Sequence, residues 1–198
     1  MIIYFDTETT GLFPGNVIQL SYIMQEKDKS TGKNFYFYVP YISPSATAVH
    51  HITQEKLDEL SGGHTFYESL EEIDDDFRAA SLSVAHNFSF DFSFMTSEFK
   101  RFDRIFHYKE SLDTMKYFKS TLKLPSKSGR GNYKMPKLIE LAEFFEIYDY
   151  DVTKEALELF GDVFSSHDAR FDTTQMYLSV LKATKNSPEL KELIKKHI

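Results

Sequence analysis

The segment IIYFDTETTG, residues 2–11, joins a short apolar run to two acidic residues. The run from Ile2 to Phe5 is rich in β-forming residues and predicts a buried strand. Because side chains alternate along a strand, Asp6 and Glu8 point to the same side. Two carboxylates held that close repel each other unless a cation lies between them. The segment therefore predicts one strand of a sheet with a divalent cation at its end.

Two acids alone are weak evidence for such a site. Asp and Glu are mostly exposed in proteins, and a pair of them more often marks a solvated strand end. Carboxylate oxygens are nevertheless the preferred ligands of hard cations such as Mg²⁺ and Mn²⁺. The choice between the two interpretations of Asp6 and Glu8 depends on the rest of the chain.

Size and composition are those of a globular protein. The 198 residues favour one domain, and a chain of this size buries roughly 70% of the surface that it exposes when unfolded. Cysteine is absent, which excludes disulfides and thiolate metal sites. The N-terminus lacks the basic region of a signal peptide, and no apolar run approaches the ~20 residues that span a bilayer. We expect a cytoplasmic protein without a membrane partner.

The formal net charge of −7 argues against a protein that binds nucleic acid by bulk electrostatics. One segment, residues 116–137, is basic and contains no acidic residue. It reads either as a solvated loop or as a guide for a nucleic acid strand. The candidate strand-guiding residues in it are Lys123, Lys127, Arg130 and Lys134. The acidic run at residues 71–76 has no calcium-loop spacing and predicts a solvated helix face.

The order of predicted elements indicates an α/β fold. A meander of three strands opens the chain, with a hairpin turn expected at Lys29–Lys33, and alternating strands and helices follow. Such an order favours one mixed five-stranded sheet, an antiparallel meander followed by parallel strands, flanked by helices. We expect a domain at residues 1–185 and a C-terminal helix at 186–198 packed on it or extending from it. The predicted strands are Ile2–Phe5, Val17–Met24, Asn34–Val39, Ser83–Ala85 and Arg104–Tyr108.

The main predicted helices begin at recognisable signals. Thr53 fits an N-cap before a short helix, and Phe66–Ala80 has helical spacing of apolar residues. Later helices are predicted at Asp91–Phe102, from Ser111, from Pro136, and at Thr153–Phe160, Asp168–Lys185 and Pro188–His197.

Two later segments carry further acids. AHNFSFD, residues 85–91, ends a predicted strand and places Asp91 at a helix start, and HDARFD, residues 167–172, supplies His167 and Asp172. Five residues correspond to about 140° around a helix axis, so His167 and Asp172 do not share a helical face. We therefore expect His167 in the loop before the helix, with Ser166 or Asp168 as the N-cap.

These three segments, in this order, resemble the motifs of the DnaQ-like (DEDDh) 3'-5' exonuclease family. Residues 49–53, VHHIT, and 112–114, LDT, are similar to lesser signatures of that family, so the resemblance spans nearly the whole chain. His51 departs from it, because the family commonly has Gly there. Asp168 stands where a basic residue is frequent.

The resemblance implies a ribonuclease H-like fold and a catalytic centre. It assigns four acids to a pair of Mg²⁺ or Mn²⁺ ions: Asp6, Glu8, Asp91 and Asp172. His167 would be the general base, a role suited to imidazole near neutral pH. A further set would border the terminal nucleotide: Thr9, Gly11, Leu12, His50 and Asn87.

The expected activity is metal-dependent 3'-5' hydrolysis of single-stranded or frayed DNA, with release of nucleoside 5'-monophosphates. The expected partner is a single-stranded 3' end, DNA in preference to RNA, with a DNA polymerase as a further candidate partner. One alternative is an RNA-directed 3'-5' exoribonuclease of the same superfamily, because the sequence does not show whether a 2' hydroxyl is accepted. An alternative of another class is a non-catalytic nucleic-acid-binding or polymerase-associated module.

Overall fold

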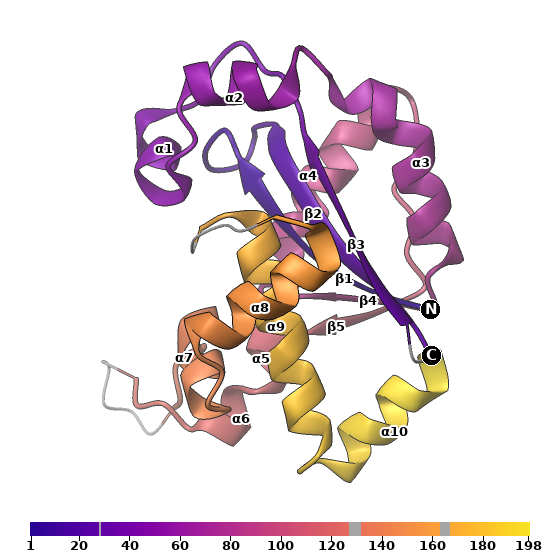
Figure 1. Cartoon of the computed structure of the whole chain (residues 1–198), viewed down its shortest axis with the longest axis vertical. Helices are drawn as coiled ribbons and strands as arrows, with labels where there is room; N and C mark the ends of the chain where they lie inside the picture. The colour runs from indigo at the N-terminus through magenta and orange to yellow at the C-terminus, as the bar shows by residue number, and fades with distance from the viewer. Residues whose placement is uncertain (28, 127–131, 163–166) are drawn as a thin grey trace.

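One mixed sheet of five strands lies at the centre of the chain (Figure 1). The computed structural model describes residues 1–27, 29–126, 132–162 and 167–198. The sheet order is β3-β2-β1-β4-β5, with β1 antiparallel to β2, β2 antiparallel to β3, and β4 parallel to both β1 and β5. The predicted fold class is therefore confirmed. The strands are β1 (Ile2–Thr9), β2 (Val17–Glu26), β3 (Lys29–Tyr36), β4 (Leu82–Ala85) and β5 (Glu110–Asp113).

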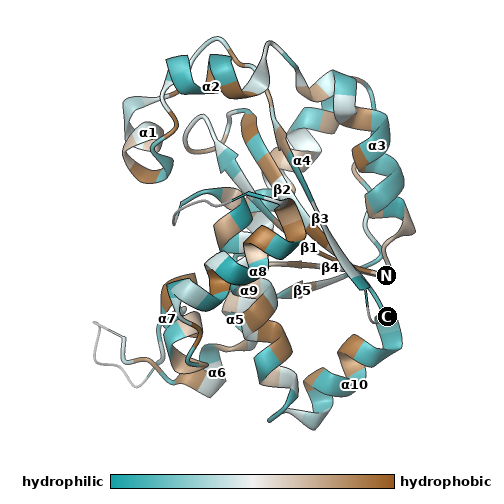
Figure 2. Ribbon diagram, viewed as in Figure 1, coloured by the Kyte–Doolittle hydropathy of each residue, from teal (hydrophilic) through white to brown (hydrophobic). Residues whose placement is uncertain are grey.

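Strand β1 divides the core in two, because its side chains alternate between the faces of the sheet. Ile2 and Tyr4 pack against the helices of the C-terminal half, and Ile3 and Phe5 pack on the opposite side. Figure 2 shows the apolar colour along β1 and hydrophilic colour over much of α2 (Gln54–Ser61) and α3 (Phe66–Ala79). The even-numbered positions of β1 therefore face the C-terminal helices.

Helices cover both faces of the sheet (Figure 1). Helices α3 and α4 pack over one face, and α7 to α10 over the other. Among the described helices, none has the length and apolar composition needed to cross a bilayer. Besides α2 and α3, the helices are α1 (Pro44–His50), α4 (Phe88–Lys100), α5 (Thr114–Tyr117), α6 (Lys119–Leu122), α7 (Leu138–Phe144), α8 (Asp149–Phe160), α9 (Ala169–Thr184) and α10 (Pro188–His197).

The two ends of the chain lie together, as Figure 1 shows. The Met1 ammonium donates to the carbonyl oxygen of His197 at 2.7 Å. Leu190 and Ile194 of α10 are buried in the same core as Ile2. Helix α10 thus packs on the sheet domain, while the expected domain boundary at residue 185 stays a prediction.

The hairpin turn predicted at Lys29–Lys33 is wrong. These residues belong to β3, which pairs with β2 from Glu26 and Lys29 onward. Gly32 lies opposite Ile23 within the ladder, where a Cβ would come within 2.5 Å of the Phe160 ring of α8. The glycine permits the close approach of a helix, and an isolated glycine in a strand has this meaning as well as that of a turn.

Four further predictions are corrected. Residues 104–108 form no strand, and β5 begins at Glu110, so the helix predicted from Ser111 begins only at Thr114. Phe106 is buried from a loop, which explains the strand-like apolar signal. The helix predicted from Asp91 begins three residues earlier, at Phe88. The acidic run at 71–76 is not wholly solvated, because Asp74 is only 2% exposed.

Candidate active site

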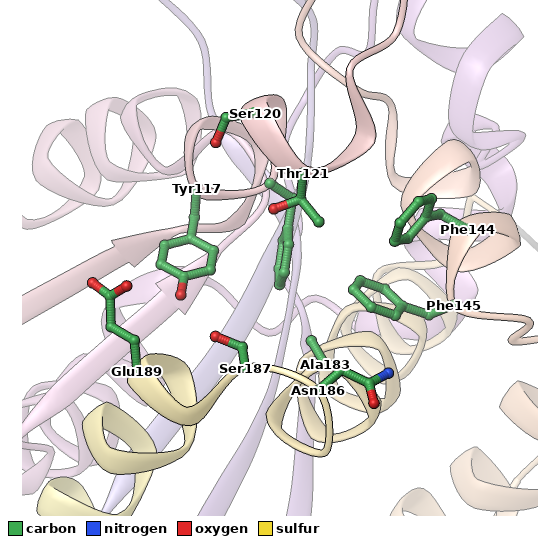
Figure 3. A pocket seen from close by; sticks show the side chains of 10 residues that line it. Tyr117, Ser120, Thr121, Phe144, Phe145, Ala183, Asn186, Ser187 and Glu189 are labelled. Atoms are coloured by element: carbon green, nitrogen blue, oxygen red, sulfur yellow. The ribbon is translucent and has the colours of Figure 1, made fainter.

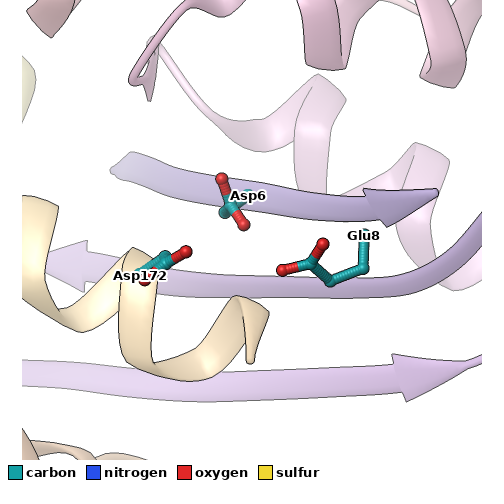
Figure 4. Close-up of side chains that lie close together, drawn as sticks. All are labelled: Asp6, Glu8 and Asp172. Atoms are coloured by element: carbon teal, nitrogen blue, oxygen red, sulfur yellow. The ribbon is translucent and has the colours of Figure 1, made fainter. Parts of the chain in front are cut away.

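Three carboxylates gather where β1 ends and α9 begins. Asp6 and Glu8 occupy even positions of β1 and therefore face α9, whose first turn carries Asp172. Each offers an oxygen, and these oxygens all lie within 4.8 Å of one another. Figure 4 shows the three side chains turned toward one another. Sequence positions far apart are thus brought to one point by the packing of α9 on the sheet.

Asp91 approaches from the other side of β1. Its neighbour Thr7 sits at an odd position and donates to Asp91 Oδ1 twice, from the backbone N–H at 3.1 Å and from Oγ1 at 2.7 Å. Asp91 is buried and lies outside the group whose oxygens share the 4.8 Å limit. Its charge nevertheless raises the pKa of both Asp6 and Glu8.

The pKa values of all four acids are raised, in each case chiefly by burial. Burial, followed by the neighbouring carboxylates, raises the pKa of Asp6 and of Glu8 well above the ordinary range. Burial raises the pKa of Asp91 to about 7, against the hydrogen bonds from Thr7. Burial also raises the pKa of Asp172 to about 6, although the backbone and side chain of His167 oppose the shift. Without a cation, the charged form of this cluster is unfavourable.

The residues fit a hard divalent cation. The charged groups with the largest effects on Asp6 and Glu8 are themselves carboxylates, and the donor set consists of carboxylate oxygens. Ions such as Mg²⁺ and Mn²⁺ prefer such ligands and would remove the repulsion between them.

His167 lies immediately before the helix that carries Asp172, as predicted. Its backbone is left-handed, with φ of 65°, and its side chain is exposed. Asp168 is the N-cap and accepts from the Arg170 N–H; Ser166, the other candidate cap, lies outside the described residues. The His167 ring stands edge-on to that of His51, with centroids 6.3 Å apart. His167 and Asp172 together line a cavity of about 410 Å³.

A second cavity, of about 450 Å³, is lined in part by Glu8. Four of the five predicted nucleotide-binding residues line it: Thr9, Gly11, Leu12 and His50. Leu12 is 86% exposed, so a large apolar side chain is available to a ligand there. Asn87 does not line the cavity; its backbone N–H donates to Asp113, and it precedes α4.

His50 is bound by the protein itself. Its Nδ1 accepts from the Ile52 N–H at 3.1 Å, which leaves Nε2 to donate to the Thr9 carbonyl at 3.2 Å. Burial lowers the pKa of His50, so the ring is neutral near pH 7. The ring therefore presents a surface to the cavity, while Nε2 contacts the end of β1 and Nδ1 contacts the backbone of Ile52.

The structure describes two of the four predicted strand-guiding residues, and their surroundings differ. Lys123 is exposed at the end of α6. Lys134 forms an ion pair with Glu140, which compensates its charge. Lys127 and Arg130 lie outside the described residues.

Another cavity lies away from the acids. About 460 Å³ in volume, it is bounded by the segments around α5 and α6, by α7, and by the turn between α9 and α10 (Figure 3). Phe144 and Phe145 form one wall and Glu189 stands at another. None of the predicted site residues lines it.

Sequence reasoning missed Gln19, which is fully buried beside the acids. Gln19 is the cross-strand partner of Glu8 and contacts the first turn of α9. The available signal was a Gln within the apolar stretch VIQLSYI, residues 17–23. Nothing in the sequence, however, placed it opposite Glu8.

Comparisons with known proteins agree with this arrangement. Residues 3–147 match the model of the family RNase_T, described as exonuclease. The chain is 33% identical over 109 residues to the DNA polymerase III subunit epsilon of Pasteurella multocida (strain Pm70), covering 50% of the chain and 42% of the relative. It is 26% identical over 215 aligned positions to the DNA polymerase III PolC-type of Mycoplasmopsis pulmonis (strain UAB CTIP), covering 98% of the chain and 14% of that relative. The chain thus matches less than half the length of either relative.

Proposed function

The chain belongs to the exonuclease family RNase_T, a DnaQ-like family of phosphodiester hydrolases, and we propose that it removes nucleotides from the 3' end of single-stranded or frayed DNA. The products are nucleoside 5'-monophosphates. The observation that carries the proposal is the group formed by Asp6, Glu8 and Asp172, whose oxygens lie within 4.8 Å of one another beside two cavities.

The four acids hold divalent cations in this proposal. Asp6, Glu8 and Asp172 form the shared site, and Asp91, fixed by Thr7, completes the set from α4. When bound, Mg²⁺ or Mn²⁺ ions supply positive charge that activates water and neutralises the phosphate. The net acidity of the chain is then compatible with a nucleic acid substrate.

His167 accepts a proton from the attacking water. Its position beside Asp172, at the edge of the 410 Å³ cavity, suits this role. The water oxygen forms a bond to phosphorus, and the bond from phosphorus to the 3' oxygen of the preceding nucleotide breaks. The shortened strand leaves with a 3' hydroxyl, which takes its proton from solvent.

The cavity beside Glu8 receives the terminal nucleotide. Thr9 and Gly11 border it with backbone groups, and the exposed Leu12 side chain offers an apolar surface to the base. His50 forms part of the wall, with its nitrogens held by the protein backbone. Two relatives are named as DNA polymerase III proteins, and on that basis we extend the proposal to DNA as substrate and a DNA polymerase as partner.

Digestion of end-labelled strands tests the proposal. Single-stranded DNA and RNA of one sequence, labelled at the 5' or 3' end, are incubated with Mg²⁺, Mn²⁺ or chelator. Wild type is compared with Asp172→Asn and with Asp75→Asn, the same chemical change at an exposed position of α3. We expect metal-dependent release of mononucleotides from DNA, abolished in Asp172→Asn only. Faster cleavage of RNA than of DNA would identify RNA as the preferred substrate. Cleavage of neither nucleic acid would favour a non-catalytic module.

A further inference from the structure

Gln19 is a fully buried polar residue whose amide spans two strands and a helix. Its Oε1 accepts from the Ala169 N–H at 3.2 Å, and its Nε2 donates to Asp168 Oδ1 at 2.9 Å. Nε2 also lies 2.8 Å from Asn34 Oδ1 and 3.1 Å from the Tyr36 hydroxyl of β3. One side chain of β2 thus holds the first turn of α9 against the sheet.

The orientation of this amide is fixed by its partners. A backbone N–H can only donate, so the atom facing Ala169 is the oxygen. An ionised carboxylate can only accept, so the atom facing Asp168 is the nitrogen. Gln19 therefore donates to the N-cap carboxylate and accepts from the first free N–H of α9 at the same time. Neither an ionised Glu nor an apolar residue can make both hydrogen bonds.

Asp168 is held in its charged form by the same network. Although burial opposes ionisation, hydrogen bonds and charge from Arg170 hold the pKa of Asp168 below its ordinary value. Arg170 contacts Asp168 Oδ1 through Nε at 2.9 Å and Oδ2 through a terminal nitrogen at 2.8 Å, and the Tyr36 hydroxyl adds a contact at 3.1 Å. Asp168 differs in this from Asp6 and Glu8, on which the charged groups with the largest effects are other carboxylates.

The position of the contact matters for the site. His167 stands directly before Asp168, and Asp172 follows within the first turn. Glu8, on the adjacent strand, is the cross-strand partner of Gln19. Farther along α9, the helix is secured by apolar packing, for example of Met176 and Val180 in the core. The Gln19 contact is thus placed to fix the helix end relative to Glu8.

We propose that Gln19 is a positioning residue that sets His167 and Asp172 relative to Asp6 and Glu8 by clamping the N-cap of α9. This inference rests on the proposed function, since it assigns a role within the same site. Such outer contacts are typically worth about 10- to 100-fold in metal affinity or activity.

The test exchanges the donor and the acceptor of the hydrogen bond between Gln19 and Asp168. Gln19→Glu keeps the acceptor for the Ala169 N–H but sets a carboxylate against Asp168. Combining it with Asp168→Asn removes the like charge and lets an amide nitrogen of residue 168 donate to residue 19, although an amide nitrogen in that place no longer accepts from the Arg170 N–H. The matched control is Tyr177→Phe, which removes a contact of 2.9 Å between α9 and Ser30 farther along the helix. For each variant, kcat and KM on a labelled oligonucleotide, Mn²⁺ affinity and the thermal midpoint are measured.

We expect Gln19→Glu to lower kcat about 10- to 100-fold and to weaken Mn²⁺ binding, with KM changed less than about twofold. The double variant should recover part of the losses in kcat and in Mn²⁺ affinity, because the like charge is removed, and Tyr177→Phe should keep wild-type kcat. The inference is overturned if Gln19→Glu cleaves and binds Mn²⁺ as wild type does, or if its losses follow only the fall in thermal midpoint. A wild type that cleaves no substrate defeats the proposed function instead, and Mn²⁺ affinity still decides the role of Gln19.

Discussion

In the described part of the chain, two clusters of buried or partly buried acids differ in how their charges are compensated. On α3, Asp74 is paired with Arg78 at 2.8 Å and with Arg104 at 2.7 Å. Asp76 of the same helix contacts Lys33 at 2.6 Å. At the end of β1, the neighbours that act most strongly on Asp6 and Glu8 are further carboxylates.

The difference indicates different roles for the two clusters. A buried carboxylate is stable when a partner compensates its charge, as the two Arg side chains do for Asp74. Carboxylates left without such a partner raise one another's pKa and destabilise the charged state. A protein keeps that arrangement where an external cation supplies the missing charge. We therefore call the first the paired cluster and the second, Asp6, Glu8, Asp91 and Asp172, the open cluster.

The largest expected effect concerns the histidine beside each cluster. His167→Gln should lower kcat by roughly 10²- to 10⁴-fold, because the proposed proton acceptor for water is lost. His107, whose Nδ1 lies 4.0 Å from Asp74 at the paired cluster, provides the control. His107→Gln should cleave as wild type does in steady-state assays. Equal kcat for wild type, His167→Gln and His107→Gln would show that His167 is not the proton acceptor.

The same substitution should have opposite effects on stability at the two clusters. In chelator at pH 8, Asp6→Asn removes repulsion and should raise the free energy of unfolding, by on the order of 1 kcal/mol or more. Asp74→Asn should lower it, because the Arg side chains lose a charged partner. Each kcal/mol corresponds to roughly 2–4 °C in thermal midpoint for a chain of this size, so calorimetry resolves both signs. Destabilisation by both substitutions would mean that the open cluster is compensated after all.

The open cluster should also make metal-free stability fall as pH rises. The folded-state pKa values of Asp91, about 7, and Asp172, about 6, lie above the ordinary value of about 3.9. Between those values the folded state binds more protons, so the free energy of unfolding decreases from about pH 4 to about pH 7. Asp91→Asn should make the decrease shallower in urea titrations at stepped pH. A slope unchanged by Asp91→Asn would contradict the assignment.

The smallest effect concerns left-handed residues near each cluster. His51, with φ of 58°, and Asp103, with φ of 54°, occupy a conformation that Gly adopts without cost. His51→Gly should raise the free energy of unfolding by about 1 kcal/mol, and Asp103→Gly by less, because Asp tolerates this region better. The His51 variant alone should alter kcat, because only His51 contacts His167. Equal kcat for the two variants would show that the contact between the His51 and His167 rings does not affect catalysis.

The open cluster was largely accessible to sequence reasoning, whereas the paired cluster was not. The alternation along β1 predicted that Asp6 and Glu8 share a side, and the resemblance to DnaQ-like exonucleases, confirmed by the family match, supplied Asp91 and Asp172. Local spacing also predicted His167 in the loop before α9. The acidic run of α3 looked solvated, because the partner Arg104 lies 30 residues from Asp74.

The remaining errors have one physical origin, which is tertiary contact. Gly32 resembles a turn residue until Phe160 of a distant helix is packed on it. Gln19 resembles an isolated polar residue until strand pairing sets it opposite Glu8 and helix packing brings Asp168 within 2.9 Å. Strand register and helix docking determine both, and neither is encoded in a short segment.

The central claim, that the open cluster binds divalent cations, is tested most directly by thermal unfolding at pH 8 with increasing Mn²⁺. Wild type and Asp74→Asn should gain roughly 5 °C or more at a hundredfold excess over Kd, since binding to the folded state contributes about 2.7 kcal/mol. Asp6→Asn should gain little. A Mn²⁺ response that is the same in Asp6→Asn and wild type, or absent from both, would contradict the claim.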